Sequence, residues 1–416
     1  MNFRTHLLPF FLLLTPTAAQ EIDQLAYNKY VVTSVQTLDA TSPSELIIKD
    51  FRGDIWIKSG LSEAVTVVRK TYLTVKSKER AHHLLQKTKL AILAEASGEG
   101  VTTIVVKSSP ERIRNLEDNL EITVPKIFSI AVDSRGGDLN LVSVQGEMDI
   151  STSGGDIDLR DLSGKITAHT DGGDIEGVQI SGRVSVSASG GSIKFEDLNG
   201  ELSGKTSGGD VRGEKIQGSV TLKTSGGEIE LYDVVGREIY GQTSGGDVTA
   251  RELVAQTTID LHTDGGNIDL EDITGQLEAS TSGGDIEIKN VRGGVKVWTS
   301  HGEIEAHLVR GAFDGRTSSG NITLSKIWDQ QYEDHDIDVK TSAGNIELTL
   351  PSDFPADFGL RVISPGRDPS EAILSHFPLI ISASRNASRG DGTVGDGRFD
   401  LRMEASMGTI KIKQEK

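Results

Sequence analysis

The sequence predicts an all-β fold, a single-chain β-solenoid of about twelve coils of 18 residues with a cap at each end. Two observations support this prediction. The six residues TSGGDI at 152–157 recur with small changes along most of the chain. Between the copies, apolar and polar residues alternate in short runs with the period of β-strands, and no helical period appears there.

The copies are evenly spaced along the chain. The first Gly of each, or the residue in its place, stands at positions 136, 154, 172, 190, 208, 226, 245, 265, 283, 301, 319 and 343. The steps between them are 18 residues, except for single steps of 19, 20 and 24. A last copy, ASMGTI, follows at 405–410. A period this constant marks a repeat architecture.

Each repeat contains two short strands and two corners. The second residue after each Gly pair is aliphatic, as at Ile157 and Ile175, and a polar residue follows it. A second corner stands at a further Gly, such as Gly164, before the next alternating strand. One such unit cannot bury its own apolar side, whereas coils stacked about 4.8 Å apart can. We expect the Gly pair to supply positive φ at the corner.

Another fold could use the same turns. A meander of β-hairpins also needs Gly-Gly corners. It would not need near-identical residues every 18 positions, whereas a solenoid places those residues in columns, so we favour the solenoid. The usual hand of crossover connections predicts right-handed coils, although hexapeptide-type solenoids depart from that rule.

The position after the Gly pair is acidic or a short polar residue in every copy. Stacked carboxylates could bind Ca²⁺, as glycine-rich nonapeptide repeats do, and a Ca²⁺-binding repeat protein is one alternative. One carboxylate per corner supplies too few oxygens for a site that needs roughly six to eight. Asn and Ser also occur in the column, so we predict turn capping through hydrogen bonds to backbone N–H groups. The predicted capping residues are Asp138, Asp156, Asp174, Asp210, Glu228, Asp247, Asn267 and Asp285.

A Thr stands two positions before the Gly pair in ten of the copies. Regular Thr columns can match an ice lattice. Here charged or bulky neighbours, such as His262 and Trp298, break the flat face that ice binding requires. Strand propensity and Thr–Thr packing explain the column more simply.

The ends of the chain lack the regular repeat. Residues 1–19 combine a basic start, an apolar run at 7–14 and small residues before Gln20, which predicts a secretory signal peptide. Residues 20–130 are expected to form a strand-rich cap with one short helix at 77–86, residues 131–350 the solenoid, and residues 351–416 a loop and a C-terminal cap. Within the first cap, Arg52-Gly53-Asp54 spells an integrin tripeptide, which we interpret as a chance match.

Composition narrows the possible partners. The formal charge is −18, with 61 acidic and 43 basic side chains, which disfavours nucleic acid and anionic lipid. No run approaches the roughly 20 apolar residues of a transmembrane helix. The chain has no Cys, so its stability depends on packing rather than disulfides. We expect a monomer that needs no cofactor.

No catalytic motif is apparent in the sequence. HExxH, GxSxG, P-loop and CxxC patterns are all absent. A solenoid polysaccharide lyase or hydrolase is the enzymatic alternative, but most corners are short and aromatic residues make up only 5 % of the chain. The repeat is interrupted near its C-terminal end, and we interpret this region as a candidate binding patch. Its predicted residues are Trp298, His301, His307 and Trp328.

The order of these parts resembles the DUF4097 and auto-transporter adhesin (head GIN domain) group of β-solenoid proteins. The resemblance rests on ITVP at 122–125, on the coils SRGGDLNL, TSGGDIDL and TSGGEIEL, and on the closing ASMGTIKI, and it covers roughly residues 42–413. It implies an exported β-solenoid and transfers no catalytic residues. The interruption at 351–400 has no obvious counterpart in the group's pattern.

These observations together predict an exported, non-enzymatic, adhesin-like scaffold in the periplasm, at the cell surface or outside the cell. Its repetitive acidic surface would bind an envelope or surface protein, or a glycan.

Overall fold

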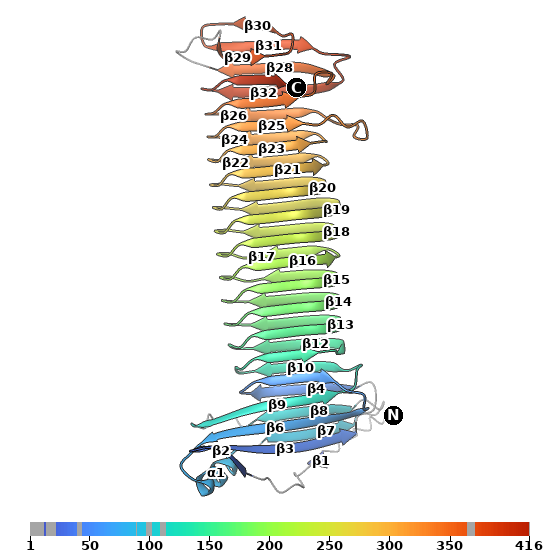
Figure 1. Cartoon of the computed structure of the whole chain (residues 1–416), viewed down its shortest axis with the longest axis vertical. Coiled ribbons are helices and arrows are strands. Elements are labelled where there is room, and N and C mark those ends of the chain that lie inside the picture. Colours follow the sequence, from blue (N-terminus) through green and yellow to red (C-terminus); the bar gives the residue numbers. More distant parts are fainter. Residues whose placement is uncertain are drawn as a thin grey trace, which may run out of the picture. The chain divides into compact units, whose positions relative to one another are not determined.

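The computed structural model describes residues 12–13, 22–39, 44–88, 90–96, 102–108, 114–363 and 371–415. The chain forms two compact units, residues 1–206 (unit 1) and 207–416 (unit 2). Each consists almost entirely of β-strands stacked side by side (Figure 1). The all-β fold class is therefore confirmed. The predicted signal peptide lies outside the described residues, apart from a two-residue strand at Leu12–Leu13.

The described residues of unit 1 form one helix, α1 (Lys78–Leu85), and fifteen strands. Their bounds are β1 (Leu12–Leu13), β2 (Ile22–Ala26), β3 (Lys29–Asp39), β4 (Ser44–Phe51), β5 (Ile55–Ser59), β6 (Ala64–Thr74), β7 (Leu90–Ala96), β8 (Thr102–Ser108), β9 (Leu116–Val124), β10 (Ser129–Ser134), β11 (Leu139–Val142), β12 (Gln145–Thr152), β13 (Ile157–Thr170), β14 (Ile175–Ala188) and β15 (Ile193–Lys205).

Parallel pairing sets the coils of unit 1 in register at 18-residue steps. Ile157 lies beside Ile175, and Ile175 beside Ile193, so equivalent residues form columns. Side chains point alternately inward and outward, because successive residues of a strand face opposite sides. Six inward positions of each coil form a narrow core, which in one coil consists of Ile157, Leu159, Leu162, Ile166, Ala168 and Thr170. The solenoid predicted from the period is present.

The stack begins inside the segment that the sequence indicated as a cap without repeats. β4 and β5 pair in parallel with β10 and β11, and β8 and β9 pair in parallel with β4 and β5 on the other side. Two coils therefore precede β10, and they stack out of chain order. Arg52-Gly53-Asp54 forms the corner between β4 and β5, where the Asp54 side chain accepts a hydrogen bond from the N–H of Asp138 at 3.1 Å.

Antiparallel strands and the helix complete the N-terminal end of unit 1. β6 pairs with β3 and β9, β2 pairs with β3, and β7 pairs with β1 and β8. Helix α1 begins after Ser77, whose side chain accepts from the N–H of Arg80, as expected for an N-cap. Its Ala81 packs in a small cluster with Tyr30 and Leu73.

The positive φ angles do not fall where the sequence analysis placed them. Gly154 and Gly155 of the Gly pair lie outside the left-handed range, and among the pairs Gly136 and Gly137 are the described exceptions. The second corner is left-handed instead. In one coil, Asp161 has φ 51° and Gly164 has φ 132°. The expectation for the Gly pair was wrong, because that corner needs Gly for another reason, given below.

Unit 2 contains eighteen strands. Their bounds are β16 (Val211–Gln217), β17 (Val220–Lys223), β18 (Ile229–Thr243), β19 (Val248–Thr263), β20 (Ile268–Thr281), β21 (Ile286–Arg292), β22 (Val295–Thr299), β23 (Ile304–Val309), β24 (Phe313–Thr317), β25 (Ile322–Lys326), β26 (Ile337–Thr341), β27 (Ile346–Leu350), β28 (Ala356–Ile363), β29 (Ile373–Ser375), β30 (Ile380–Ala383), β31 (Ala387–Thr393), β32 (Phe399–Ser406) and β33 (Ile410–Gln414).

The coils of unit 2 repeat the same parallel register as far as the last copy. β26 and β27 pair with β32 and β33, so the segment 351–398 leaves the stack between two consecutive coils. That segment is not one long loop: it forms β28 to β31. β28 pairs in parallel with β32 and antiparallel with β31, and β30 adds to β31 (Figure 1). These strands therefore cover the end of the coil stack within unit 2.

Candidate functional site

The polar residues after the Gly pair form hydrogen bonds between coils. Asp156 Oδ1 accepts from the backbone N–H of Asp174 at 2.8 Å, one coil further along. The bonds thus join successive corners instead of closing single turns, because stacked corners bring each side chain beside the next backbone. Equivalent bonds of 2.7 to 3.0 Å are made by Asp138, Asp174, Asp210, Asp247, Asn267 and Asp285, and Glu228 takes part through its N–H.

Substitution at Asp247 tests this ladder. Its Oδ1 accepts from the N–H of Asn267 at 2.7 Å. Asp247→Asn keeps the acceptor, so we expect little change in the free energy of unfolding. Asp247→Ala removes it and should cost about 1 kcal/mol, measured by denaturant unfolding. Two results together would instead indicate a carboxylate-dependent cation site: equal losses of unfolding free energy in the two variants, and stabilisation by added Ca²⁺ of the wild type but of neither variant.

The second Gly of each pair is fixed by the spacing of the coils. A Cβ added at Gly266 would lie 2.1 Å from the backbone oxygen of Gly246 in the preceding coil. A Cβ at the first Gly, Gly265, would come no nearer than 3.5 Å to any neighbour. The sequence agrees with this difference in space. The first position of the pair is not Gly in four copies, whereas the second is always Gly; the four residues are His301, Ser319, Ala343 and Met407.

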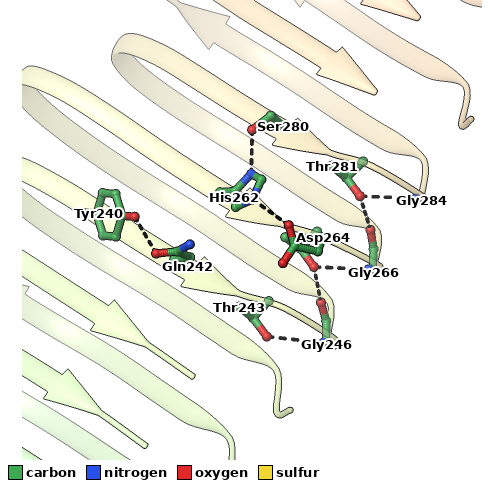
Figure 2. A network of polar contacts seen from close by, with 11 residues as sticks. Tyr240, Gln242, Thr243, Gly246, His262, Asp264, Gly266, Ser280, Thr281 and Gly284 are labelled. Atoms are coloured by element: carbon green, nitrogen blue, oxygen red, sulfur yellow. Dashed lines mark hydrogen bonds and ion pairs between the residues drawn. The ribbon is translucent and has the colours of Figure 1, made fainter. Parts of the chain in front are cut away.

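The Thr column is buried and hydrogen-bonded at the same corner. Thr263 Oγ1 donates to the oxygen of Gly246 at 2.8 Å and accepts from the N–H of Gly266 at 3.1 Å. Figure 2 shows the equivalent contacts of Thr243 and Thr281 with their corner glycines. Thr263 is 0 % exposed, so its hydroxyl cannot contact ice. The hydrogen bonds explain the Thr more directly than strand propensity does.

The outward face of the second strand of each coil in unit 2 carries two columns of side chains, which we call the outer stripe. Parallel register places equivalent residues of successive coils beside one another. The first column contains Gln242, His262, Ser280, Trp298, Arg316, Lys340 and Glu404. The second contains Tyr240, Asp260, Glu278, Lys296, Asp314, Asp338 and Arg402.

A polar network centred on His262 lies in the outer stripe (Figure 2). His262 Nδ1 lies 2.8 Å from Ser280 Oγ, and Nε2 lies 3.2 Å from Asp264 Oδ1. The imidazole is thus held between a hydroxyl of the next coil and a carboxylate of its own corner. The ring of Trp298, two coils along, has its centroid 6.3 Å from that of His262.

The Ser–His–Asp arrangement recurs where the columns bring the same residue types together. His169 in unit 1 makes the same two contacts, with Ser187 and Asp171, at the same 2.8 and 3.2 Å. Its recurrence follows from the columns. A triad also needs N–H donors for an oxyanion. Around Ser280, β20 is paired with β19 and β22 on both sides, which commits the N–H groups of these described strands to the ladders.

Two carboxyl groups of the outer stripe are electrostatically strained. Burial and then the nearby Glu278 raise the pKa of Asp260. Burial also raises the pKa of Asp314, with Asp338 of the next coil adding to the effect. Acids stacked about 4.8 Å apart repel each other, but Arg316 opposes the effect at Asp314, with which it pairs at 3.0 Å, so the outer stripe carries carboxylates and cations side by side.

The structure separates the four predicted patch residues. Trp298 is 47 % exposed on β22 beside His262, whereas His307 lies on β23 and its Nε2 is 4.0 Å from Glu305. His301 takes the first-Gly position of a corner, with Nδ1 3.2 Å from the oxygen of Ser282. Trp328 is half-buried and packs edge-on against Phe354, at a ring distance of 6.4 Å. Trp298 is therefore the member that lies on the outer stripe, and Trp328 covers the core.

At its far end the outer stripe enters a groove of about 540 Å³, which we call the C-terminal groove. Its floor and walls come from β24, β26, β28, β31 and β32. The basic lining residues are Arg316, Lys340, Arg361 and Arg402. The acidic ones are Asp338, Asp357, Asp391, Asp400 and Glu404. Ion pairs cross the groove floor, for example Arg316 with Asp338 at 3.2 Å and Lys340 with Glu404 at 3.2 Å.

On β25, Lys326 occupies a core position. It lies beside Val309 of the preceding coil, is 2 % exposed, and its Nζ donates to the oxygen of Gly311. Burial lowers its pKa to about 7. His335, which is fully buried, has Nε2 2.9 Å from the oxygen of Asp329 and an Nδ1 without a hydrogen-bond partner. Burial also lowers the pKa of His335.

The sequence analysis missed an exposed Trp in unit 1, in addition to Trp298 of unit 2. Trp56 on β5 is 40 % exposed and lines a mostly apolar hollow of about 340 Å³ with Val142 and Glu121. Like Trp298, it occupies an outward position of a coil, where most residues are polar. The alternation of IWIK after the Arg52-Gly53-Asp54 corner could have revealed it.

The described residues also bear on metal binding and on membrane insertion. They include no group of three or more His, Asp or Glu side chains placed to hold a metal ion. Within the same residues, no helix is long and apolar enough to cross a membrane.

Comparison with known proteins agrees with this architecture. Residues 182–349 match the family model described as Toastrack DUF4097. The matched part of the repeat region is therefore similar to the DUF4097 family. The matched DUF4097 coils include the His262 network and Trp298, whereas the strands β28 to β33 lie beyond them. No protein of curated function matches the chain.

One solved structure is similar in extent. It is a crystal structure described as a "putative cell adhesion protein from Clostridium sporogenes ATCC 15579", 11 % identical, covering 92 % of this chain and 99 % of that one. Its TM-score is 0.18, so this likeness carries no argument about fold or function.

Proposed function

We propose that this protein is an exported, non-enzymatic scaffold that binds a partner at the cell envelope or surface through its outer stripe. The observation that carries the proposal is the exposed Trp298 beside His262, set among hydrogen-bonding side chains held in columns by the coils. A half-exposed Trp with polar neighbours is a typical anchor for a partner. Export is supported by the sequence of residues 1–19, in which an apolar run at 7–14 is followed by small residues before Gln20, as in a secretory signal peptide.

The non-enzymatic part of the proposal has two supports. The imidazoles of His169 and His262 sit on open strand faces, where backbone N–H groups are already paired. The columns also repeat the same side chains over several coils, which suits extended contact better than a single reaction centre.

Trp298→Ala tests the outer stripe. Purified wild-type protein should bind envelope fractions of the source organism, and Trp298→Ala should weaken this binding at least about tenfold, because Trp anchors commonly contribute 2 kcal/mol or more. Binding is measured by surface plasmon resonance on immobilised envelope fragments. Trp56→Ala is the matched control, since Trp56 is similarly exposed at 40 % but lies in unit 1.

The outcomes separate the alternatives. Loss of binding in Trp56→Ala but not in Trp298→Ala would move the site to unit 1 and overturn the proposal. Release of shortened sugar chains from the envelope fragments during the assay would overturn its non-enzymatic part.

A further inference from the structure

The floor of the C-terminal groove has a gap where a side chain would otherwise stand. Gly359 occupies an outward position of β28, between Arg402 of β32 and Asp391 of β31. A Cβ built on Gly359 would meet nothing within 4 Å, and its φ lies outside the left-handed range. The backbone therefore does not require Gly here. The missing side chain keeps the groove open between two charged neighbours.

The groove is rich in charge but nearly neutral. Its lining has four basic and five acidic side chains, a difference of one. Besides the pairs already described, Arg402 lies 3.1 Å from Asp400, and Arg361 lies 3.7 Å from Glu404. Donors and acceptors thus lie side by side on the groove floor. A polyanion would meet the carboxylates and a polycation the guanidinium groups, so neither gains from the groove as a whole.

The length of the C-terminal groove and its position next to Trp298 also indicate what it can bind. The groove crosses the five adjacent strands β24, β26, β32, β28 and β31, a length of about 19 Å at about 4.8 Å per strand. Trp298 lies beside Arg316 in the first column of the outer stripe, one strand before the groove begins. A ligand in the groove can therefore extend onto an exposed aromatic ring, which offers a flat apolar surface with hydrogen-bonding neighbours.

We propose that the C-terminal groove binds an uncharged, linear oligosaccharide that lies over Gly359 and stacks on Trp298. Hydroxyl and amide groups both donate and accept hydrogen bonds, which suits a nearly neutral groove in which carboxylates and cations are neighbours. The C–H face of a sugar ring suits the Trp surface. This inference rests on the proposed function and names the chemical class of its partner.

Filling the gap tests the site without removing any of its polar groups. Binding of chitohexaose and cellohexaose is measured by isothermal titration calorimetry, with oligogalacturonate as the anionic probe and a glucosamine oligomer as the cationic one. Wild-type protein should bind an uncharged probe. Gly359→Leu should weaken that binding at least about tenfold by occupying the gap. Gly154→Leu is the matched control, because Gly154 is also unobstructed but lies at a corner of unit 1.

A second variant guards against an indirect effect of the larger side chain. Arg361→Ala removes a donor from the groove without filling it and should also weaken binding, while both variants keep the melting temperature of the wild type. Binding that survives Gly359→Leu would overturn the location. Tighter binding of the charged probes would overturn the ligand class.

The failure of this inference differs from failure of the proposed function. If no probe binds but Trp298→Ala still abolishes binding to envelope fragments, the scaffold function stands and the oligosaccharide site is wrong. If uncharged probes bind and envelope fragments do not, the groove is a sugar site without the proposed envelope role.

Discussion

Lys326→Met is expected to stabilise unit 2 and to remove a pH dependence of its stability. The Lys326 side chain is 2 % exposed in an otherwise apolar column, and its pKa falls from 10.5 to about 7 because burial penalises the charged form. That shift corresponds to about 5 kcal/mol against the folded state at pH 7. Met has similar length and no charge. The oxygen of Gly311 loses its donor, so we expect a net gain of about 2–4 kcal/mol.

The pH dependence follows from the direction of the shift. Between pH 7 and 10.5 the unfolded chain holds a proton on Lys326 that the folded chain does not. The unfolded state therefore binds more protons in that window, and the stability of the wild type rises as the pH rises through it. Asp334 and Asp336 raise the pKa of Lys326, and the value of about 7 already contains their effect. Lys326→Met should show a flat profile over the same range.

The lowered pKa of His335 affects stability in a different pH range from that of Lys326, so the two effects can be measured separately. Burial lowers the pKa of His335 and favours its neutral imidazole in the folded chain. As the pH falls below the ordinary pKa of 6.5, the unfolded chain gains a proton on this residue first, so the free energy of unfolding decreases. Urea unfolding at a series of pH values measures both effects. Lys289→Met, an exposed lysine on β21, serves as the control and should change stability by less than about 0.5 kcal/mol. A destabilised Lys326→Met throughout pH 7 to 10 would contradict the prediction.

The sequence contains enough information to predict the coils. Residues such as Ile157, Ile175 and Ile193 repeat at 18 positions, and alternation assigns each to the inward face, so period and strand geometry together determine the columns. The same arithmetic could have placed His262, Ser280 and Trp298 in one column, since they are spaced by 18. Their contacts are therefore predictable in principle from the register.

Other features depend on tertiary contacts that no local pattern encodes. β8 and β9 stack on β4 and β5 although β6, α1 and β7 lie between them in the chain. The groove requires β28 to lie beside β32, which joins segments about forty residues apart. Lys326 stands in an inward position by alternation alone, but the energetic cost of burying it becomes visible only with its surroundings.

The corner glycines provide the sharpest test of how the coils pack. Gly266→Ala places a methyl group 2.1 Å from the backbone oxygen of Gly246. The two coils must separate at this corner to remove the clash. Their separation also lengthens the hydrogen bond from Thr263 to the same oxygen, which is 2.8 Å in the wild type. We expect a loss of more than about 3 kcal/mol, because overpacking against backbone cannot be relieved by a side-chain rotation.

The neighbouring residue supplies the matched control. Gly265→Ala adds the same methyl group one position earlier, where the nearest atom is 3.5 Å away and φ lies outside the left-handed range. Ala also restricts the unfolded chain, so stability should stay the same or rise by up to about 1 kcal/mol. Denaturant unfolding and hydrogen exchange of the β19 and β20 amides measure both variants. Since both substitutions remove one Gly, similar losses would show that backbone freedom, rather than the distance between coils, selects glycine at these corners.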